Sequence, residues 1–285
     1  MTMKALVTLT SEESKRLIAK AIAKMPAVLK AREKGIIGFT VCTSAAFAAE
    51  EVIGEPLDLA KYCCGFVHAN GMCFEHPDEN TRELVLVEGR QTWLDWPAEN
   101  ISQFLERMGP EDVIIKSGNV LGTDGRAAAL MASPDGGEFG KCLPYIYAAG
   151  IELIVPMTLN KSLHVDIDEL ASMAGAKRLD SKWTYGLTVG IMPLPGRVVT
   201  EIEALEILAG VQALPLSTGA FGTGEGAVSI LIRGDDSRVE KAWELIRAIK
   251  GEPKLNHTLP ECKNCEAPRP DSGNRCRTRR VFHKL

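Results

Sequence analysis

The chain of 285 residues has no apolar run that approaches the length of a membrane-spanning helix. Residues 1–14 hold too short an apolar run for a secretory signal, and no small-residue cleavage pattern follows them. We therefore expect a cytoplasmic protein with no membrane partner. In that setting the eight cysteines, which are spread over the whole length, fit reduced thiols or a metal site better than a disulfide framework.

An excess of charge of one sign is also absent. The formal net charge is -4, with acidic and basic residues interspersed, so the chain has no overall basic field and we expect no extended nucleic-acid partner. Hydrophobic residues make up 45% and charged residues 25%, which excludes a disordered or fibrous class. The length allows one large domain or two ordinary ones.

The most informative stretch is 112–156, DVIIKSGNVLGTDGRAAALMASPDGGEFGKCLPYIYAAGIELIVP. Its apolar runs predict two short strands, at 113–115 and 127–132, with a Gly-Thr-Asp-Gly turn between them. Helical spacing follows over 138–149, and then a third strand at 153–155. The order strand, glycine-rich loop, helix, strand is typical of an α/β crossover whose loop can hold an anionic ligand at a helix N-terminus.

An earlier segment repeats this local design. Thr10 and Glu13 form a capping box before a long helix, and the apolar run 36–43 then predicts a buried parallel strand. Ser44 is the expected cap of the next helix, 45–53. Two less regular segments complete this half of the chain, a strand or hairpin at 83–92 and a helix at 97–108.

From residue 183 onward the sequence changes character. It predicts strands at 185–192, 211–216 and 227–233 and helices at 200–209 and 235–249, an order that suits a small ferredoxin-like α+β unit. The glycines of GAFGTGEG, 219–226, precede a strand and not a helix, so they do not form a nucleotide-binding loop. The fold class we predict is α/β, an open mostly parallel sheet flanked by helices, followed by this unit. The predicted domains are 1–182 and 183–253, with a Cys- and Arg-rich tail at 254–285.

The loop before helix 138–149 is the leading candidate for a site. Gly136 and Gly137 let a phosphate or carboxylate approach the backbone amides, and Lys141 adds positive charge one turn later. The same glycines also suit a tight turn that binds nothing. Asp135 and Glu138 would repel an anion unless they act as acid and base, and either of them can instead cap the helix.

Other candidates lie at the ends of the predicted strands. Asp124 belongs to an Asp-Gly turn, and its carboxylate either faces the same cleft or serves only the turn. Thr43 and Ser44 follow the buried strand, at the edge where ligands of open α/β sheets bind. The neighbouring Cys42 is either a nucleophile or a buried structural thiol.

Cysteine and histidine gather in two further places. In the tail, one Cys-x-x-Cys pair and two single residues provide enough ligands for a tetrahedral zinc site, or else free thiols: His257, Cys262, Cys265 and Cys276. A second cluster lacks paired ligand spacing and is typical of buried thiols beside surface histidines: Cys63, Cys64, His68, Cys73 and His76.

The order of elements in 11–165 resembles the fold shared by ribose-5-phosphate isomerase, glucosamine-6-phosphate deaminase and the CoA transferases. The resemblance is carried by the long first helix, the GIIGFTVCTS strand, the helix after it and the IIKSGNVLGTDG segment. Asn119 stands where methylthioribose-phosphate isomerases have a carboxylate, and their Asn-Lys-Ile-Gly is replaced by Ala-Ala-Ala-Leu at 127–130. The Lys-Gly-Gly-Gly segment of ribose-5-phosphate isomerases is missing as well. The whole chain also resembles uncharacterised prokaryotic proteins that join such a domain to a small α+β unit.

The resemblance and the loops together imply a cleft at the strand ends that binds a small anionic ligand, either a sugar phosphate or a CoA-like molecule. Gly118 and Asn119 join the loop residues as expected contacts, and Asp124 or Asp135 is the expected proton-transfer group of an isomerase or transferase. The alternative is a non-catalytic ligand-sensing or regulatory protein with a metal-binding tail. Homo-oligomers are compatible with both hypotheses.

Overall fold

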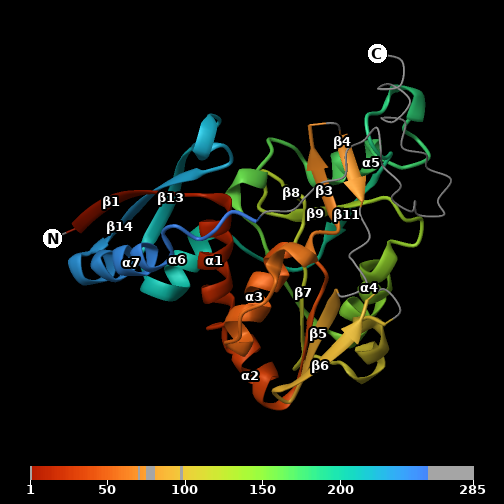
Figure 1. Cartoon of the computed structure of the whole chain (residues 1–285), viewed down its shortest axis with the longest axis horizontal. Helices are drawn as coiled ribbons and strands as arrows, with labels where there is room; N and C mark the ends of the chain where they lie inside the picture. The colour runs from red at the N-terminus through yellow and green to blue at the C-terminus, as the bar shows by residue number, and fades with distance from the viewer. Residues whose placement is uncertain (1, 70, 75–80, 97–98, 256–285) are drawn as a thin grey trace.

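The computed structural model describes residues 2–69, 71–74, 81–96 and 99–255. The protein is a mixed α/β structure with several sheets (Figure 1). The largest sheet has six strands in the order β12-β10-β7-β2-β5-β6. Its strands are β2 (Ile36–Phe39), β5 (Arg82–Val87), β6 (Arg90–Asp95), β7 (Val113–Ile115), β10 (Glu152–Pro156) and β12 (Arg197–Val199).

The large sheet is not mostly parallel, so that part of the predicted fold class is wrong. β12, β10, β7 and β2 pair in parallel, whereas β2 pairs antiparallel with β5, and β5 with β6. The reason lies in the segment 82–95, which folds as a tight hairpin at Glu88 and Gly89, both with positive φ. The hairpin adds its first strand to the edge of β2 and makes the sheet mixed.

Three smaller sheets complete the β structure. Their orders are β1-β14-β13, β11-β9-β8 and β3-β4. The strands are β1 (Thr2–Leu9), β3 (Gly65–His68), β4 (Gly71–Phe74), β8 (Val120–Leu121), β9 (Ala127–Met131), β11 (Gly190–Leu194), β13 (Gln212–Thr218) and β14 (Val228–Asp235). The boundary at residue 183 stays a prediction, and three pairings cross it: β1 with β14, β9 with β11, and β10 with β12.

Among the described residues, the α-helices are α1 (Ser11–Ile22), α2 (Pro26–Lys34), α3 (Thr43–Ile53), α4 (Gly137–Ala149), α5 (Ile167–Met173), α6 (Glu201–Ala209) and α7 (Asp236–Ile249). Short 3-10 segments are η1 (Leu59–Tyr62), η2 (Ile101–Arg107), η3 (Leu159–Lys161), η4 (Ser181–Trp183) and η5 (Gly222–Gly224). The capping box of Thr10 and Glu13 is confirmed. The long first helix is two helices, because Pro26 starts a new one, and the helix expected at 97–108 is only the 3-10 segment η2.

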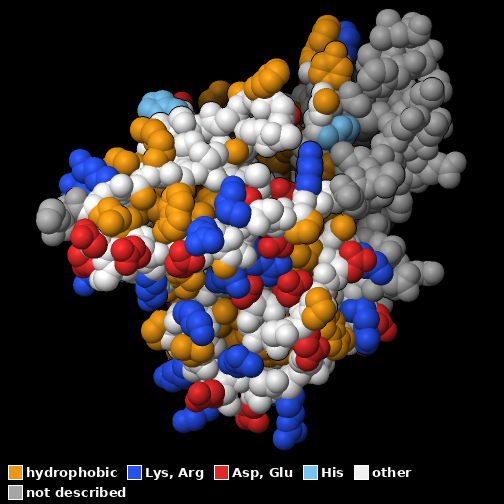
Figure 2. All heavy atoms as spheres, turned by 60° about the vertical axis from the view of Figure 1, so that its left-hand side comes forward, with side chains coloured by type: hydrophobic (Ala, Val, Ile, Leu, Met, Phe, Trp, Pro, Cys, Tyr) orange, Lys and Arg blue, Asp and Glu red, His pale blue; other side chains and the backbone are white. Residues whose placement is uncertain are grey.

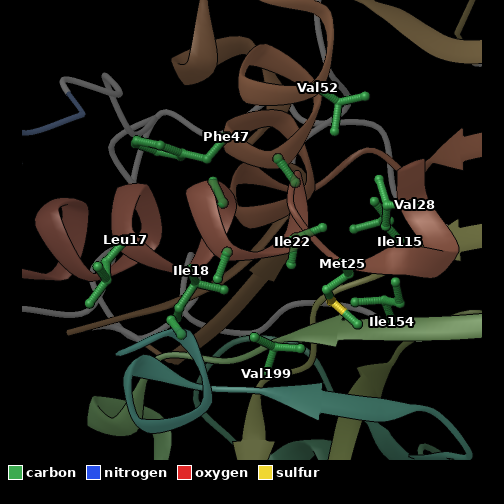
Figure 3. Packing of buried hydrophobic residues seen from close by; sticks show 14 of the residues in the cluster. Leu17, Ile18, Ile22, Met25, Val28, Phe47, Val52, Ile115, Ile154 and Val199 are labelled. Carbon is green, nitrogen blue, oxygen red and sulfur yellow. The ribbon is translucent and has the colours of Figure 1, made fainter. Parts of the chain in front are cut away.

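The core lies on both faces of the large sheet. Successive side chains of β7 alternate between the faces, so Val113 and Ile115 pack with α1, α2 and α3 while Ile114 packs with α4 and η2. Figure 3 shows the first of these clusters, in which helix residues such as Ile22 and Phe47 meet the strand residues Ile115, Ile154 and Val199. This packing fixes the helices against the sheet. It thereby determines where the carboxyl ends of the parallel strands stay accessible.

A charged cluster fixes the position of α3 further. Arg16 of α1 is mostly buried and donates to the carboxylates of Glu50 and Glu51 on α3 and of Glu252 after α7, at 2.7 to 3.0 Å. Its guanidinium also lies 4.7 Å from the centroid of the Phe47 ring. Three separate parts of the chain therefore meet at one cation, which holds the C-terminal end of α3 in a defined place relative to α1.

The face drawn in Figure 2 carries basic, acidic and hydrophobic side chains side by side, without a large area of one sign. Within the part of the chain that the structure describes, every helix is either too short or too polar to span a bilayer.

Candidate functional site

A cavity of about 460 Å³ opens where the parallel strands β2 and β7 end. Its walls come from the segment that joins β2 to α3, from the four residues after β7, from β9 and from the start of α4. Aromatic side chains, including Trp96 and Phe139, close it on the side of the β5–β6 hairpin and α4. The volume suits a small molecule such as a sugar phosphate or part of a cofactor.

Most of the residues predicted as ligand contacts line this cavity. They come from three separate segments that the fold brings together: Thr43, Gly118, Asn119, Asp135, Gly136, Gly137 and Lys141. Two predicted residues do not line it. Ser44 is buried beside Thr43, and its hydroxyl has no hydrogen-bond partner among the described residues.

Asp124 is the second residue outside the cavity. It lies in the turn between β8 and β9, where its carboxylate accepts hydrogen bonds from the side chain and the backbone N–H of Arg126. The same guanidinium bridges to Asp168 at 3.1 Å. These contacts lower the pKa of Asp124 and make it a turn residue, so its catalytic role stays a prediction that the cavity geometry does not support.

Asp135 lines the cavity, but its carboxylate is already engaged. It accepts hydrogen bonds from Ser133 Oγ and, at 2.9 Å, from the backbone N–H of Gly137, and these bonds lower its pKa. Gly136, at φ 78°, donates its own N–H to the carbonyl of Ser133. The N–H groups of Gly136 and Gly137 therefore already have protein acceptors. Asp135, which precedes the N-cap Gly136, accepts the first N–H of α4 and so has a role close to the capping role that the sequence left as an alternative.

The start of α3 is different. The helix begins at Thr43, and its N-cap is Cys42, whose side chain makes no capping bond. The expectation that Ser44 caps this helix is therefore wrong: Ser44 lies inside the first turn. Within the described residues, no group accepts the N–H bonds of Thr43, Ser44 or Ala45. An uncapped helix start at the wall of a cavity presents partial positive charge and free donors.

The segment after β7, residues 116–119, contacts the start of α3. The backbone N–H of Ser117 points to Cys42 Sγ at 3.5 Å, so this segment contacts the N-cap of α3. A Cβ at position 118 would lie 2.7 Å from the carbonyl oxygen of Ala128, which explains the glycine. Asn119 donates its N–H to that carbonyl and accepts from the N–H of Leu130, so its side chain extends the pairing with β9.

Lys161, at the end of η3, lines the cavity and is one of the side chains there that the sequence analysis missed. Its ammonium donates to the carbonyl of Gly118 at 2.8 Å and to Ser117 Oγ at 3.3 Å, at the wall of the cavity. Burial and the neighbouring positive charges of Lys15 and Lys116 lower the pKa of Lys161 to about 8. The buried carboxylate of Glu201 holds the segment in place, because it accepts the N–H of Leu159 at 3.0 Å.

Two more lysines surround the same space. Lys116 lines the cavity, with its ammonium 6.0 Å from the centroid of the Phe139 ring, and Lys15 of α1 is mostly buried close to Cys42 and Cys63. Burial lowers the pKa of Lys15, which has Glu12 at 3.7 Å. Within the described ranges, neither Lys116 nor Lys161 forms an ion pair with a carboxylate. The cavity wall therefore holds two ammonium groups without a direct carboxylate partner, together with the acidic residues Asp135 and Glu138.

The carboxyl groups of Glu83 and Glu138 meet where β5 packs against the first turn of α4. Glu83 of β5 is 0% exposed and contacts the side chain of Glu138, which lines the cavity from the first turn of α4. Glu83 Oε2 accepts from the N–H of Ile101 at 2.9 Å, and Glu138 Oε2 from Trp96 Nε1 at 3.4 Å. Burial and the adjacent Glu138 raise the pKa of Glu83 well above its ordinary value.

The thiols of Cys42, Cys63 and Cys64 also line the cavity. Burial raises the pKa of Cys64 to about 12, which keeps that sulfur protonated at neutral pH. The described residues contain no cluster of His, Cys, Asp and Glu side chains that could hold a metal ion. The four predicted tail ligands, His257, Cys262, Cys265 and Cys276, lie outside the described residues, as does His76.

Sequence reasoning missed Lys116, Lys161 and Glu83 for different reasons. Lys116 immediately follows an apolar strand, and this position at a strand end is a signal that could have identified it. Lys161 follows β10 after four intervening residues, so the signal is weaker. Glu83 looks like any polar residue of an alternating strand, and nothing local shows that its side chain is buried against α4.

Comparisons with known proteins add no identification: no protein-family model, no curated protein and no solved structure matches the chain.

Proposed function

We propose that the cavity binds a small anionic ligand, a sugar phosphate or a CoA-like molecule, and that its anionic group lies between Lys161 and the start of α3. The observation that carries the proposal is the state of Lys161. Its ammonium has three donors, two of which are used by Gly118 and Ser117. No carboxylate among the described residues forms an ion pair with it, and Glu201 acts on it only from beyond ion-pair distance. An anion supplies both the missing acceptor and the missing charge.

The start of α3 supports the same position. Thr43 lines the cavity, and the N–H groups of Thr43, Ser44 and Ala45 are free to donate to an anion. Helix N-termini with free amides are recurrent phosphate sites, since the donors and the helix dipole act together. Lys116 and Lys15 add further positive charge around this position.

The loop at Asp135 to Gly137 then has a secondary role in the proposal. The N–H groups of Gly136 and Gly137 already have acceptors, so the proposed contact of the ligand on this side is through the ammonium of Lys141, one turn into α4. The negative charge of Asp135 faces the capping amide and Ser133, which limits its repulsion of a ligand at the far side of the cavity.

The proposed activity is that of an isomerase or transferase, by the resemblance of residues 11–165 to the sugar-phosphate isomerase and CoA transferase fold. The α6–β13–β14–α7 part, which packs on β1, is proposed to be a ferredoxin-like unit. A ligand-sensing protein would use the same cavity and differ only in the absence of turnover, so a turnover assay on any ligand found separates the two. Cytoplasmic location and homo-oligomer formation stay parts of this proposal.

A thermal-shift screen tests the binding proposal. Sugar phosphates and CoA thioesters are titrated against the wild type, Lys161→Gln and the control Lys241→Gln, which changes an exposed lysine of α7. A ligand present at 100 times its dissociation constant stabilises the folded state by about 2.7 kcal/mol. We expect such a shift in the wild type and the control, and a much smaller one in Lys161→Gln. No stabilisation by any of these compounds, or equal stabilisation of all three proteins, contradicts the proposal.

A further inference from the structure

The carboxyl groups of Glu83 and Glu138 have incomplete hydrogen bonding. Each uses one oxygen, Glu83 toward Ile101 and Glu138 toward Trp96. The other oxygen of each, Oε1, is buried and has no N–H or O–H donor within the described residues. Buried carboxylate oxygens without partners are costly, and two ionised carboxylates in contact repel each other strongly.

A single proton on the pair removes both the repulsion between the two carboxylates and the lack of hydrogen-bond partners for their buried oxygens. If it lies between the two side chains, one carboxyl donates to the other, the pair carries a single negative charge, and the buried oxygens gain a partner. No neighbouring group among the described residues donates a hydrogen bond to the two Oε1 atoms in place of that proton. The titratable groups that face the pair are Lys116, the phenol of Tyr62, and the thiols of Cys64 and Cys142, with Lys141 farther along α4.

We infer that Glu83 and Glu138 share one proton, and that Glu138, the member that lines the cavity, is the proton-transfer group of this site. The inference rests on the proposed function, because it assigns chemistry to the ligand held by Lys161 and α3. It replaces Asp124, which does not line the cavity, and Asp135, whose carboxylate caps α4. Glu83 is a positioning residue, since it is fully buried behind Glu138.

The ligand class that uses such a group is a phosphorylated hydroxycarbonyl compound, in which the carbon next to the carbonyl bears a hydroxyl group. The ionised oxygen of Glu138 takes a proton from the carbon next to the carbonyl, and the C–H electron pair forms the C=C bond of an enediolate. The negative charge that develops on the ligand oxygen is stabilised by the positive charge of Lys116 and Lys161 in the cavity. Return of the proton from Glu138 to the ligand restores the pair, so the step needs no other reactant.

The shared proton is measured directly. An infrared spectrum at neutral pH shows the carbonyl band of a buried carboxylic acid in the wild type and in the control Glu244→Gln, which changes an exposed glutamate of α7. Glu83→Gln loses the contribution of the pair to this band, because Glu138, which lines the cavity, then has no carboxyl group with which to share a proton. In Glu138→Gln the band shifts, since Glu83 stays fully buried and loses its partner carboxyl group. Absence of the band in the wild type, or an unchanged band in Glu83→Gln, overturns the inference.

Proton transfer is measured by exchange. Ribose 5-phosphate and dihydroxyacetone phosphate are incubated with each protein in deuterium oxide, and loss of the carbon-bound hydrogen next to the carbonyl is followed by NMR. Loss of a general base lowers such rates by about 10²- to 10⁴-fold, which we expect for Glu138→Gln. Glu83→Gln retains exchange with a pH profile that differs from that of the wild type, since Glu138 no longer shares a proton with a carboxyl group; a merely structural role of Glu83 leaves the profile unmoved.

The outcomes separate this inference from the proposed function. If neither sugar phosphate stabilises the protein, the proposed function fails for this ligand class, whereas the infrared band still decides whether the proton is shared. If a sugar phosphate binds to the wild type but its carbon-bound hydrogen does not exchange, the assignment of Glu138 is wrong and the binding site stands.

Discussion

The helices α3 and α4 both begin at the wall of the cavity, but among the described residues only α4 has its first N–H, that of Gly137, bonded to a side chain. α4 begins with glycines that suit an anion, and Asp135 has already taken up an amide there. α3 begins without a glycine loop, yet its first amides have no acceptor among the described residues, and Lys161, Lys116 and Lys15 lie around it. Whether a helix start can bind an anion thus depends on its own cap, which glycine content does not reveal.

The largest effect is expected from a change that places negative charge beside the free N–H groups at the start of α3. Thr43→Asp puts a carboxylate in the first turn of α3, where it stabilises the helix and repels an anion. Like charges brought together at a binding site cost several kcal/mol, so we expect affinity for the sugar phosphate or CoA ligand to fall on the order of 100-fold. Titration calorimetry measures the change.

Thr43→Asn is the matched control, because it keeps the shape of the new side chain and omits the charge. We expect it to retain most of the affinity. Equal binding by the Asp and Asn variants would mean that the anionic group does not lie at α3, and the α4 loop would again be the leading candidate.

Much of the local structure could be predicted from the sequence. The capping box of Thr10 and Glu13, the helix after Gly136 and the hairpin around Gly89 depend on neighbouring residues, so local patterns reveal them. The partner of the hairpin could not be predicted this way. Its pairing with the edge of β2 is a contact between distant segments, and it decides whether the sheet is parallel or mixed.

The same distinction applies to the site. Thr43, Gly118 and Gly137 were found because small residues after a strand, or before a helix, indicate a loop near a sheet edge. Their chemistry was not predictable, because it is set by residues from elsewhere. Lys161 reaches the cavity only through η3, and Glu83 acts only because the hairpin packs against the start of α4.

The contributions of Glu83 and Asp135 to the free energy of unfolding should change with pH in opposite directions. The pKa of Glu83 is raised in the folded state, so above about 4.5 the folded protein holds more protons than the unfolded chain, and stability falls as pH rises through that window. One proton corresponds to at most about 1.4 kcal/mol per pH unit. The pKa of Asp135 is lowered below 3.8, so its contribution is lost as pH falls through the folded-state value.

Urea unfolding over a series of pH values separates the two effects. Glu83→Gln should flatten the profile on the side above pH 4.5, and Asp135→Asn on the acid side. A profile of Glu83→Gln with the same slope as the wild type would show that Glu83 is not held protonated in the folded state.

The smallest effects concern the caps themselves. Asp135→Ala removes an acceptor of the first N–H of α4 and should lower the free energy of unfolding by about 1 kcal/mol.

Cys42→Ser supplies a hydroxyl at the N-cap of α3, where it can accept from the first-turn amides, and should raise the free energy of unfolding by a similar amount. The serine competes with a ligand for those donors, so the same variant should bind the anion more weakly although it is more stable. Cys63→Ser, which changes another thiol of the cavity away from any α-helix start, should do neither. If Cys42→Ser gains stability with unchanged affinity, the amides of α3 serve only the helix, and Lys161 with Lys116 must account for any binding alone.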